Sequence, residues 1–303
     1  MDLSIIIVNY NTKELLCQTL ESVFRNHPKY RFEVFVVDNH STDGSCEMVR
    51  EMFPQVLLIE NDENEGFSRA NNQAIKVSQG RYVLLLNSDT IVLADALDTM
   101  LEFLEDNPSI GAVGCKVVLP NGKLDLACRR SFPTPMNALF QALGLSRLFP
   151  KNPLFAQYNL THLDEDKTYP VDCLVGAFMM VRRETIEQVG LLDENFFMYG
   201  EDIDWCYRIK QAGWEIYYHP GAKIIHYKGA SSEKRKYRMI YEFHRAMLIF
   251  YTKHYARKKF FLVNWLVITG IWLRFAASVA ANLFKKKRSQ RGERFDQEQP
   301  KSA

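Results

Sequence analysis

The sequence predicts an α/β protein with a mixed, mostly parallel β-sheet flanked by helices, and three observations support this prediction. Short, β-branched apolar runs recur through the first ninety residues, which is typical of strands buried on both faces. Amphipathic stretches of helical period separate these runs, and such alternation builds right-handed βαβ units. The composition, 47% hydrophobic and 24% charged, is that of a folded protein and excludes disordered and collagen-like classes.

The elements follow from the same periodicity. Strands are expected at 3–8, 32–37, 56–59 and 82–86, and later at 173–181, 214–218 and 223–226. Helices are expected at about 11–24, 44–52, 67–77 and 201–211, the first capped by Asn11. The Asn121-Gly122 pair indicates a hairpin turn. Residues 131–168 are proline-rich and aperiodic, which predicts an irregular excursion that covers a site or binds a partner.

Polar residues follow each of the first four predicted strands. In parallel sheets, ligands bind beyond the carboxyl ends of the strands. Because polar residues also suit turns, any single loop is weak support for a site, but four together favour one. The residues are Asn9 and Asn11, then Asp38, then Asn64 and Gly66, and finally Asn87, Ser88 and Asp89.

A dense acidic cluster begins the helix expected at 201–211. Glu201, Asp202 and Asp204 fall within four residues, and carboxylates at a helix start are stabilised by the helix dipole. Asp204 and Arg208 are spaced for an intrahelical ion pair. The cluster also suits general-base catalysis, which needs a carboxylate positioned to take a proton.

Six segments in order resemble glycosyltransferase family 2, and within it the rhamnosyltransferase-like branch that builds bacterial surface polysaccharides. They are SIIIVNYN, VVDNHSTDGS, NEGFSRANNQAI, LLLNSDT, GLLDENFFMYGEDIDWCYRIKQAG and IIHYKGAS, spanning roughly residues 3–232. The resemblance implies the Rossmann-like GT-A fold, a nucleotide-diphosphate sugar donor, a divalent metal and inversion at the anomeric carbon. dTDP-rhamnose is the first donor expected and UDP-hexoses the second.

The resemblance also implies roles for individual residues. Asp202 is the expected base and Glu201 the residue that orients the acceptor, with Glu201 as the alternative base. Asp89 and His226 are expected to hold Mg²⁺ or Mn²⁺, although Asn87 stands where many relatives have a first aspartate. Gly176 and Ala177 are expected beside the acceptor sugar. The expected donor-binding residues are Asn9, Asn11, Asp38, Asn64, Gly66, Arg69, Asn71, Asn87 and Ser88.

The C-terminal part is strongly basic. Residues 243–291 contain eleven Lys or Arg and no acid, so the remainder has 38 − 11 = 27 basic against 36 acidic residues, a net charge of −9. An apolar run at 260–284 lies between basic clusters, and Asn264, Arg274, Ser278 and Asn282 share one helical face. This pattern favours a helix lying in an anionic membrane surface, over a spanning helix or one packed on protein.

These observations predict a catalytic domain at 1–240, with a nucleotide-binding half (about 1–110) and an acceptor half (about 111–240). Membrane-associating helices at 241–288 and a disordered end at 289–303 would follow. Six dispersed cysteines and a start without basic residues indicate a cytoplasmic protein with no secretory signal, held at the inner face of the cell membrane by its tail.

The expected partners are the sugar donor, a saccharide acceptor on a polyprenyl carrier and the anionic membrane, and no nucleic acid. One alternative is a sugar-phosphate nucleotidyltransferase, which needs a glycine-rich loop after the first strand, where residues 9–12 contain no glycine. The other is a non-catalytic scaffold at the membrane.

Overall fold

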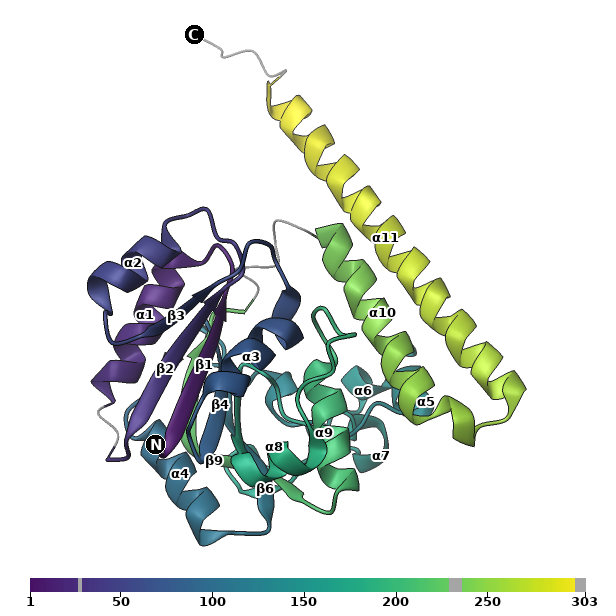
Figure 1. Ribbon diagram of the computed structural model, residues 1–303. Helices are drawn as coiled ribbons and strands as arrows, with labels where there is room; N and C mark the ends of the chain where they lie inside the picture. The colour runs from purple at the N-terminus through teal and green to yellow at the C-terminus, as the bar shows by residue number, and fades with distance from the viewer. Residues whose placement is uncertain (27–28, 229–235, 298–303) are drawn as a thin grey trace. The chain divides into compact units, whose positions relative to one another are not determined.

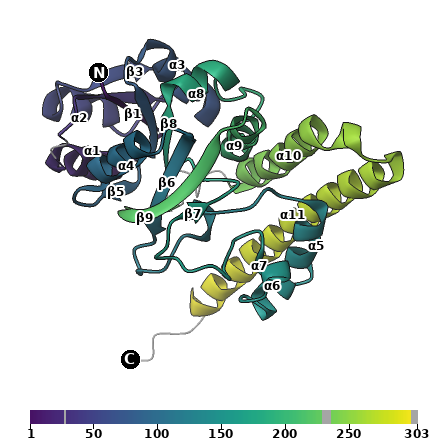
Figure 2. The same cartoon turned by 90° about the horizontal axis from the view of Figure 1, so that it is seen from below.

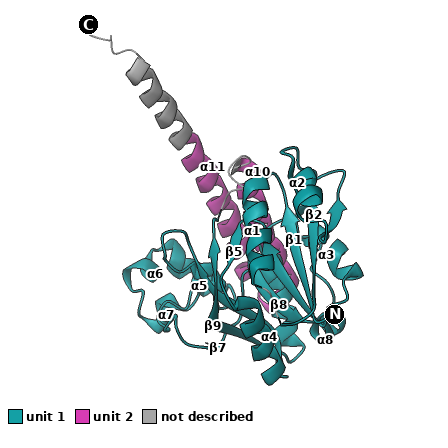
Figure 3. Cartoon of the chain, turned by 90° about the vertical axis from the view of Figure 1, so that its left-hand side faces the viewer, with its two compact units in different colours: residues 1–233 teal, residues 234–303 magenta. Residues whose placement is uncertain are grey.

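The computed structural model describes residues 1–26, 29–228 and 236–297. The chain divides into two compact units, residues 1–233 and 234–303 (Figure 3). The first unit contains the whole β-sheet, in which strands from the expected nucleotide and acceptor halves pair side by side. The second unit is helical.

Four parallel strands form one side of the sheet, in the order β3-β2-β1-β4 (Figure 1). They are β1 (Leu3–Asn9), β2 (Phe32–Asp38), β3 (Leu57–Glu60) and β4 (Tyr82–Asn87). This confirms the four strands expected from the apolar runs. The run in β1 is buried on both faces, as a strand at the centre of such a sheet requires.

The other side of the sheet is mixed and continues in the order β8-β6-β9-β5. β8 (Phe178–Arg182) runs antiparallel to β4 and β6, whereas β6 (Ile110–Val118) and β9 (Glu215–His226) are parallel. The short strands β5 (Thr90–Val92) and β7 (Tyr169–Pro170) each pair antiparallel with β9.

Two strand predictions need correction here. The strand expected at 173–181 begins only at Phe178. The strands expected at 214–218 and 223–226 are one strand, because the register with β6 shifts between Cys115 and Lys116 and absorbs Pro220-Gly221 without ending β9. The hairpin turn at Asn121-Gly122 is confirmed by an antiparallel bridge between Val118 and Leu124.

Helices cover both faces of the sheet (Figure 2). On one face lie α1 (Lys13–Arg25), α2 (Ser45–Met52) and α4 (Ala96–Asp106). On the other lie α3 (Gly66–Val77), α8 (Arg183–Val189) and α9 (Glu201–Gln211). This layering confirms the α/β fold class, and its main core lies between the sheet and these helices.

The cap expected for α1 is wrong. Thr12 occupies the N-cap position and makes no side-chain cap, while Asn11 has a positive φ of 54°. The Asn11 side chain instead accepts a hydrogen bond from the Thr42 amide at 2.8 Å, so it joins the loop after β1 to the loop after β2.

The excursion at 131–168 is less irregular than its composition indicates. It contains three short helices, α5 (Pro135–Ala142), α6 (Leu145–Leu148) and α7 (Pro153–Ala156), preceded by the 3₁₀ turn η1 (Leu126–Cys128). Pro135 and Pro153 each stand at the first helical position, where proline lacks no needed hydrogen bond. The prolines therefore begin helices rather than prevent them.

The second unit is a helical hairpin of α10 (Lys236–His254) and α11 (Phe261–Gln297), joined through the 3₁₀ turn η3 (Ala256–Lys258). By length and composition, Phe261–Leu283 of α11 could cross a membrane, with a mean hydropathy of 1.6. Its polar face meets α10: Tyr251 Oη donates to Asn264 Oδ1 at 2.8 Å, and Arg274 lies 5.8 Å from the Phe243 ring centroid.

The C-terminal end needs a further correction. Residues 289–297, expected to be disordered, continue α11 as helix. Five of these nine residues are Arg, Gln or Glu, which have high helix propensity, so an existing helix can extend through them in spite of Gly292. Residues 298–303 lie outside the described residues.

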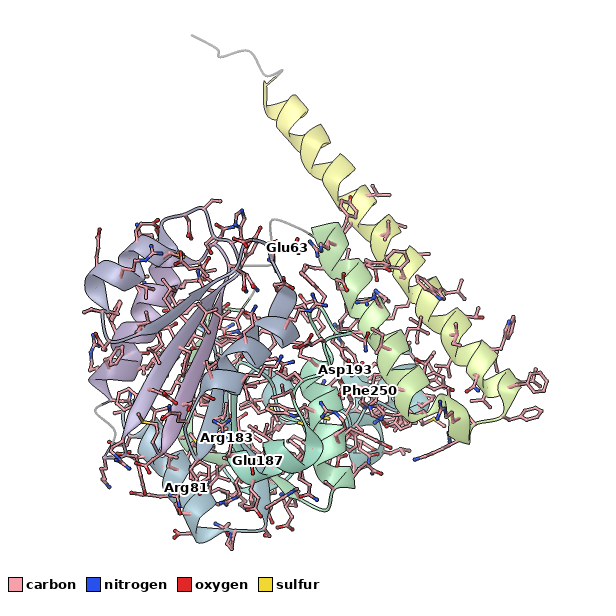
Figure 4. The ribbon with its side chains drawn as sticks, viewed as in Figure 1. Glu63, Arg81, Arg183, Glu187, Asp193 and Phe250 are labelled. Atoms are coloured by element: carbon pink, nitrogen blue, oxygen red, sulfur yellow. The ribbon has the colours of Figure 1, made fainter. Side chains whose placement is uncertain are left out.

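Gly80 lies where the chain enters β4 and packs against the start of β1. A Cβ on Gly80 would come within 2.4 Å of the amide nitrogen and of the hydroxyl oxygen of Ser4. Arg183 Nε donates to the Gly80 carbonyl at 2.9 Å. Figure 4 shows Arg183 at the end of the sheet opposite Glu63, which follows β3. The backbone leaves no room for a side chain at this junction.

We expect Gly80→Ala to lower the free energy of unfolding by about 1–3 kcal/mol, because overpacking against backbone displaces β1 from β4. Urea unfolding followed by circular dichroism measures the loss. Gln79→Ala, at the exposed neighbouring position, is the matched control and should stay within about 0.5 kcal/mol of the parent protein. Equal stability of the two variants would contradict the close packing.

Candidate active site

Asn9 and Asp38 lie side by side at the carboxyl ends of β1 and β2, and both are buried. Asn9 Nδ2 donates to Asp38 Oδ2 at 2.7 Å, and the Ser41 amide donates to Asp38 Oδ1 at 2.7 Å. Thr12 Oγ1 donates to Asn9 Oδ1 at 2.7 Å and lies 2.9 Å from Ser88 Oγ, in the loop after β4. Three of the four predicted polar loops therefore meet through direct hydrogen bonds.

The fourth loop joins this group through the start of α3. Asn64 Oδ1 accepts from the Gly66 amide at 3.0 Å, and Asn39 Nδ2 donates to the Gly66 carbonyl at 3.0 Å. Gly66 has a φ of 82°, and a Cβ there would lie 2.4 Å from the Phe197 carbonyl oxygen. Only glycine fits this approach. Asn71 is buried one turn further on and donates to the Phe67 carbonyl at 2.8 Å.

Arg69 contacts the fourth loop only through Glu65, among the residues that the structure describes. Its exposed guanidinium pairs with Glu65 at 2.9 Å and with Glu194 at 3.3 Å. These two carboxylates compete with a diphosphate for the same charge. A donor-binding role for Arg69 stays a prediction.

Asp89 and His226 meet at the end of β4 and β9, and both are buried. His226 Nε2 lies 3.1 Å from Asp89 Oδ1 and 3.3 Å from Asn87 Nδ2. Asp125 faces the other ring nitrogen, with its Oδ2 at 3.5 Å from His226 Nδ1. Lys228 Nζ donates to Asp125 Oδ1 at 3.0 Å. The predicted metal ligands are thus neighbours, backed by a second carboxylate.

The charges of this cluster stabilise one another. Burial alone would lower the pKa of His226, but Asp125 and Asp89 outweigh it and raise the pKa to about 9. Burial would likewise raise the pKa of Asp125, but hydrogen bonding to His226 and the charge of Lys228 hold it well below its usual range.

A second buried cluster lies at the start of α9. Arg130 Nη2 donates to Asp202 Oδ2 at 2.7 Å and also to the Leu174 carbonyl. The Ile203 amide donates to Asp202 Oδ1 at 2.8 Å. Glu201 is buried beside Asp202, and its Oε2 has no hydrogen-bond partner within the part of the chain that the structure describes.

Glu201 is held in its neutral form. Burial, followed by the adjacent charge of Asp202, raises the pKa of Glu201 to about 8. At neutral pH it therefore carries a proton and can donate a hydrogen bond, whereas Arg130 supplies the opposite charge for Asp202. Two adjacent carboxyl groups with different environments suit the two roles of a proton acceptor and a proton donor.

One short segment connects the two clusters. Asp125 contacts His226, and Arg130, five residues later, contacts Asp202. Five residues span at most about 17 Å, so the clusters belong to one neighbourhood. Ala177 lies in the same region, because its carbonyl accepts from the Asn87 amide at 3.2 Å.

Gly176, next along the chain, abuts α3. A Cβ on Gly176 would lie 3.2 Å from the Phe67 ring, which is tight for any side chain. The predicted acceptor wall thus lies between the end of β4 and the start of α3.

The family model described as glycosyl transferase family 2 matches residues 4–190, more than half of the chain. The chain belongs to glycosyltransferase family 2. It is therefore a glycosyltransferase, and the family match decides against the nucleotidyltransferase and scaffold alternatives.

The sequence similarity of this family 2 glycosyltransferase to its relatives covers more of the chain than the family model does. The N-acetylglucosaminyl-diphospho-decaprenol L-rhamnosyltransferase of Mycobacterium tuberculosis is 27% identical, over 84% of this chain and 86% of that protein. The rhamnosyltransferase WbbL of Escherichia coli K12 is 26% identical, over 74% of this chain and 82% of that protein.

A solved structure supports the fold. The crystal structure of GalNAc-T7 with UDP, GalNAc and Mn²⁺ has a TM-score of 0.56 at 18% identity. The match covers 75% of this chain and 44% of that one, so this glycosyltransferase spans less than half of that protein. The likeness confirms the expected GT-A fold.

The residues of this glycosyltransferase fit a divalent ion. Asp89 and His226 place an oxygen and a ring nitrogen at one point, and His226 would ligate an ion in its neutral form, after releasing the Nε2 proton that it holds toward Asp89. An outer carboxylate such as Asp125 is the usual orienting partner of a ligating histidine. Among the described residues, no group of three His, Cys, Asp or Glu side chains could hold a metal alone. Mg²⁺ and similar ions commonly take one or two protein ligands together with substrate phosphates and water.

Sequence reasoning missed two residues of the site. Asp125 and Arg130 bind their partners across 101 and 72 positions of sequence, so no local pattern reveals the contacts. The sequence offers one indication of a role in the site: neither Asp125 nor Arg130 belongs to a periodic helix or strand pattern.

The neutral state of Glu201 generates a stability prediction. Above about pH 4.5 the unfolded chain releases the Glu201 proton, while the folded protein keeps it until about pH 8. Relative to Glu201→Gln, the parent protein should therefore lose up to about 1.4 kcal/mol of stability per pH unit across this window. Urea unfolding at pH 5, 6.5 and 8 measures the difference.

The exposed Glu187, labelled in Figure 4, provides the control for this series. Glu187→Gln should follow the parent protein at every pH. If Glu201→Gln did so as well, the buried carboxyl would not be neutral in the folded state.

Proposed function

We propose that this glycosyltransferase moves rhamnose from dTDP-rhamnose, with a UDP-hexose as the second choice of donor, to a saccharide on a polyprenyl diphosphate carrier. The transfer inverts the anomeric carbon and serves the synthesis of a cell-surface polysaccharide. Two relatives are named rhamnosyltransferases, and the name of one includes a diphospho-decaprenol saccharide. The family resemblance supports inversion.

The observation that carries the proposal is the difference between the two carboxyl groups at the start of α9: Arg130 donates to Asp202, whereas Glu201 Oε2 has no hydrogen-bond partner among the described residues. Arg130 balances the charge of Asp202, while burial keeps Glu201 protonated. Inverting transfer needs one carboxylate that can accept the proton of the acceptor hydroxyl. A protonated Glu201 cannot do this at neutral pH, which favours Asp202 as the base over the alternative.

The transfer forms one bond and breaks another. The acceptor hydroxyl oxygen attacks the anomeric carbon, the bond from that carbon to the diphosphate oxygen breaks, and the hydroxyl proton passes to Asp202. A carboxylate offers about four lone-pair sites, of which Arg130 and the Ile203 amide use two, so Asp202 retains room to accept. Glu201 donates a hydrogen bond that orients the acceptor, and Gly176 and Ala177 allow the sugar to approach.

At the donor side, Asp38 accepts from the pyrimidine N3–H, with Asn9 fixing its orientation. Asp89 and His226 would hold Mg²⁺ or Mn²⁺, which supplies positive charge to the leaving diphosphate. Lys228 pairs with Asp125, the carboxylate that contacts the same histidine. The remaining predicted donor residues, Asn11, Asn64, Gly66, Asn71, Asn87 and Ser88, shape the loops that surround the nucleotide sugar.

The second unit holds the enzyme at the cytoplasmic face of an anionic membrane. The polar face of α11 is covered by α10 through Asn264 and Arg274, whereas Phe261, Trp265 and Leu273 are exposed. An in-plane hairpin satisfies both facts, because α11 enters the interface with its apolar side and α10 forms the layer toward water.

We expect Asp202→Asn to reduce transfer by about 10²–10⁴-fold, the usual contribution of a general base, with donor affinity nearly unchanged. Product formation from dTDP-rhamnose and isothermal titration with the nucleotide measure the two effects. Glu201→Gln keeps a hydrogen-bond donor and should lose far less activity. The reverse ranking of these two variants would identify Glu201 as the base.

In the presence of Mn²⁺, Asp89→Ala should weaken nucleotide binding by more than about 100-fold. Loss of a residue that only orients a metal ligand typically costs about 10–100-fold, and Asp89 is expected to ligate the ion itself. Binding measured with chelator should be the same for the parent and the variant. Calorimetry with dTDP and UDP provides both values. Asp106→Ala, at an exposed position on α4, is the control. Unchanged affinity of Asp89→Ala would remove the metal role.

A further inference from the structure

Half of the exposed large apolar side chains in the described part of unit 1 come from 19 consecutive residues. Twelve such side chains are found there in all, and six of them lie between positions 136 and 154, each 45–70% exposed. They are Met136, Leu139, Leu143, Leu148, Phe149 and Leu154. Isolated exposed apolar residues are ordinary, but a concentration of them marks an interaction surface.

These side chains belong to a small folded lobe, defined as α5, α6, α7 and their connections (residues 135–156). Its interior is aromatic: the Phe155 ring lies 5.0 Å from Phe140 and 5.5 Å from Phe149. Ala156 is buried beneath it. Phe140 and Phe155 are half-buried by these contacts, whereas Leu139, Leu143 and Leu148 stay exposed, so the packing of the lobe leaves these leucines uncovered.

The charge of this segment is one-sided. Residues 126–163 contain no Asp or Glu, although the chain outside the basic tail carries a net charge of −9. Arg147 and Lys151 are exposed and flank Leu148 and Phe149 along the chain. Apolar side chains next to cations, in a segment without acids, complement an anionic lipid surface, in which cations reach the headgroups while leucine and phenylalanine enter the acyl region.

We propose that the α5–α7 lobe is a membrane-inserting surface of the catalytic unit, in addition to α11, and that its partner is an anionic lipid bilayer. The lobe follows Arg130, the residue that hydrogen-bonds to Asp202, after four connecting residues. Asn137 Nδ2 in the lobe donates to Ser131 Oγ in this connection at 3.3 Å. Insertion of the lobe therefore brings Asp202, the proposed catalytic base, close to the lipid surface. That insertion brings the active site to a lipid-linked acceptor rests on the proposed function. The contact between the lobe and the membrane does not.

An environment-sensitive fluorophore on the full chain tests the lobe directly. The label is placed at Leu148→Cys in a Cys17→Ser background, because Cys17 is half-buried and the other five cysteines are buried. With vesicles of phosphatidylglycerol the emission should shift to the blue and be quenched by spin-labelled lipid. A label at Val77→Cys, exposed at the end of α3, should not respond. A label at Leu273→Cys reports on α11.

Each other outcome overturns the proposal. A silent label at 148 with a responsive label at 273 means that α11 alone meets the membrane. Silence at both positions means that neither does. Emission at 148 that is already blue before vesicles are added means that protein covers the lobe. An equal response to phosphatidylcholine vesicles removes the preference for anionic lipid.

Partitioning gives a second readout. Replacing Leu139, Leu143 and Leu148 together with Gln should lower partitioning of the full chain into phosphatidylglycerol vesicles by at least about tenfold, given the hydrophobic free energy of each leucine. The matched control replaces the exposed Met52, Leu57 and Val77 with Gln and should leave partitioning unchanged. Equal partitioning of both variants would overturn the proposal. Neither readout uses sugar transfer, so both stand even if the donor or acceptor is assigned wrongly.

Discussion

The buried ion pair between Arg130 and Asp202 is the interaction on which the rest of the site depends. Two carboxyl groups are adjacent at a buried helix start, and without a cation neither could ionise cheaply. Arg130 is hydrogen-bonded to Asp202, whereas at Glu201 burial and the charge of Asp202 outweigh the charge of Arg130 and raise the pKa. The ion pair also fixes the entry of the α5–α7 lobe, because the next residue after Arg130 begins that excursion.

The donor side depends on a different constraint, the parallel alignment of β1, β2 and β4. Their carboxyl ends lie at one edge of the sheet, so the side chains that follow them can bond directly. The chain from Asp38 through Asn9 and Thr12 to Ser88 contains only hydrogen bonds of 2.7–2.9 Å. A network that is satisfied internally holds the loops before any ligand arrives, which lowers the ordering cost of binding.

The parallel half of the fold could be predicted from the sequence because apolar runs report directly on strands buried on both faces. Asp38, Asn87 and Asp89 could be placed at one edge for the same reason. The mixed half could not: β9 continues through Pro220-Gly221 only because β6 shifts register beside it. The contacts of Asp125 and Arg130 could not be predicted from the sequence either. Arg129 and Arg130 look alike in the sequence.

Tertiary contacts alone separate these two arginines. Arg129 lies over the rings of Tyr169 and Tyr218, whereas Arg130 turns to Asp202. Even Asp202, which the family motif indicates, has its electrostatic role only through this distant partner. The motifs therefore indicated the two carboxylates, and the folded structure shows that their surroundings differ.

Burial of Glu201 lowers the stability of the folded protein. A buried carboxyl oxygen without a hydrogen-bond partner costs about 1–3 kcal/mol, and a glutamine or a hydrophobic residue at the same place would avoid the pH-dependent penalty. A ligand that accepts a hydrogen bond from Glu201 would remove this cost. An acceptor hydroxyl can do so, because it accepts the Glu201 proton in a hydrogen bond and offers its own proton to Asp202. In the proposed function, the Glu201 oxygen and the ion-paired Asp202 carboxylate therefore bind one acceptor hydroxyl together.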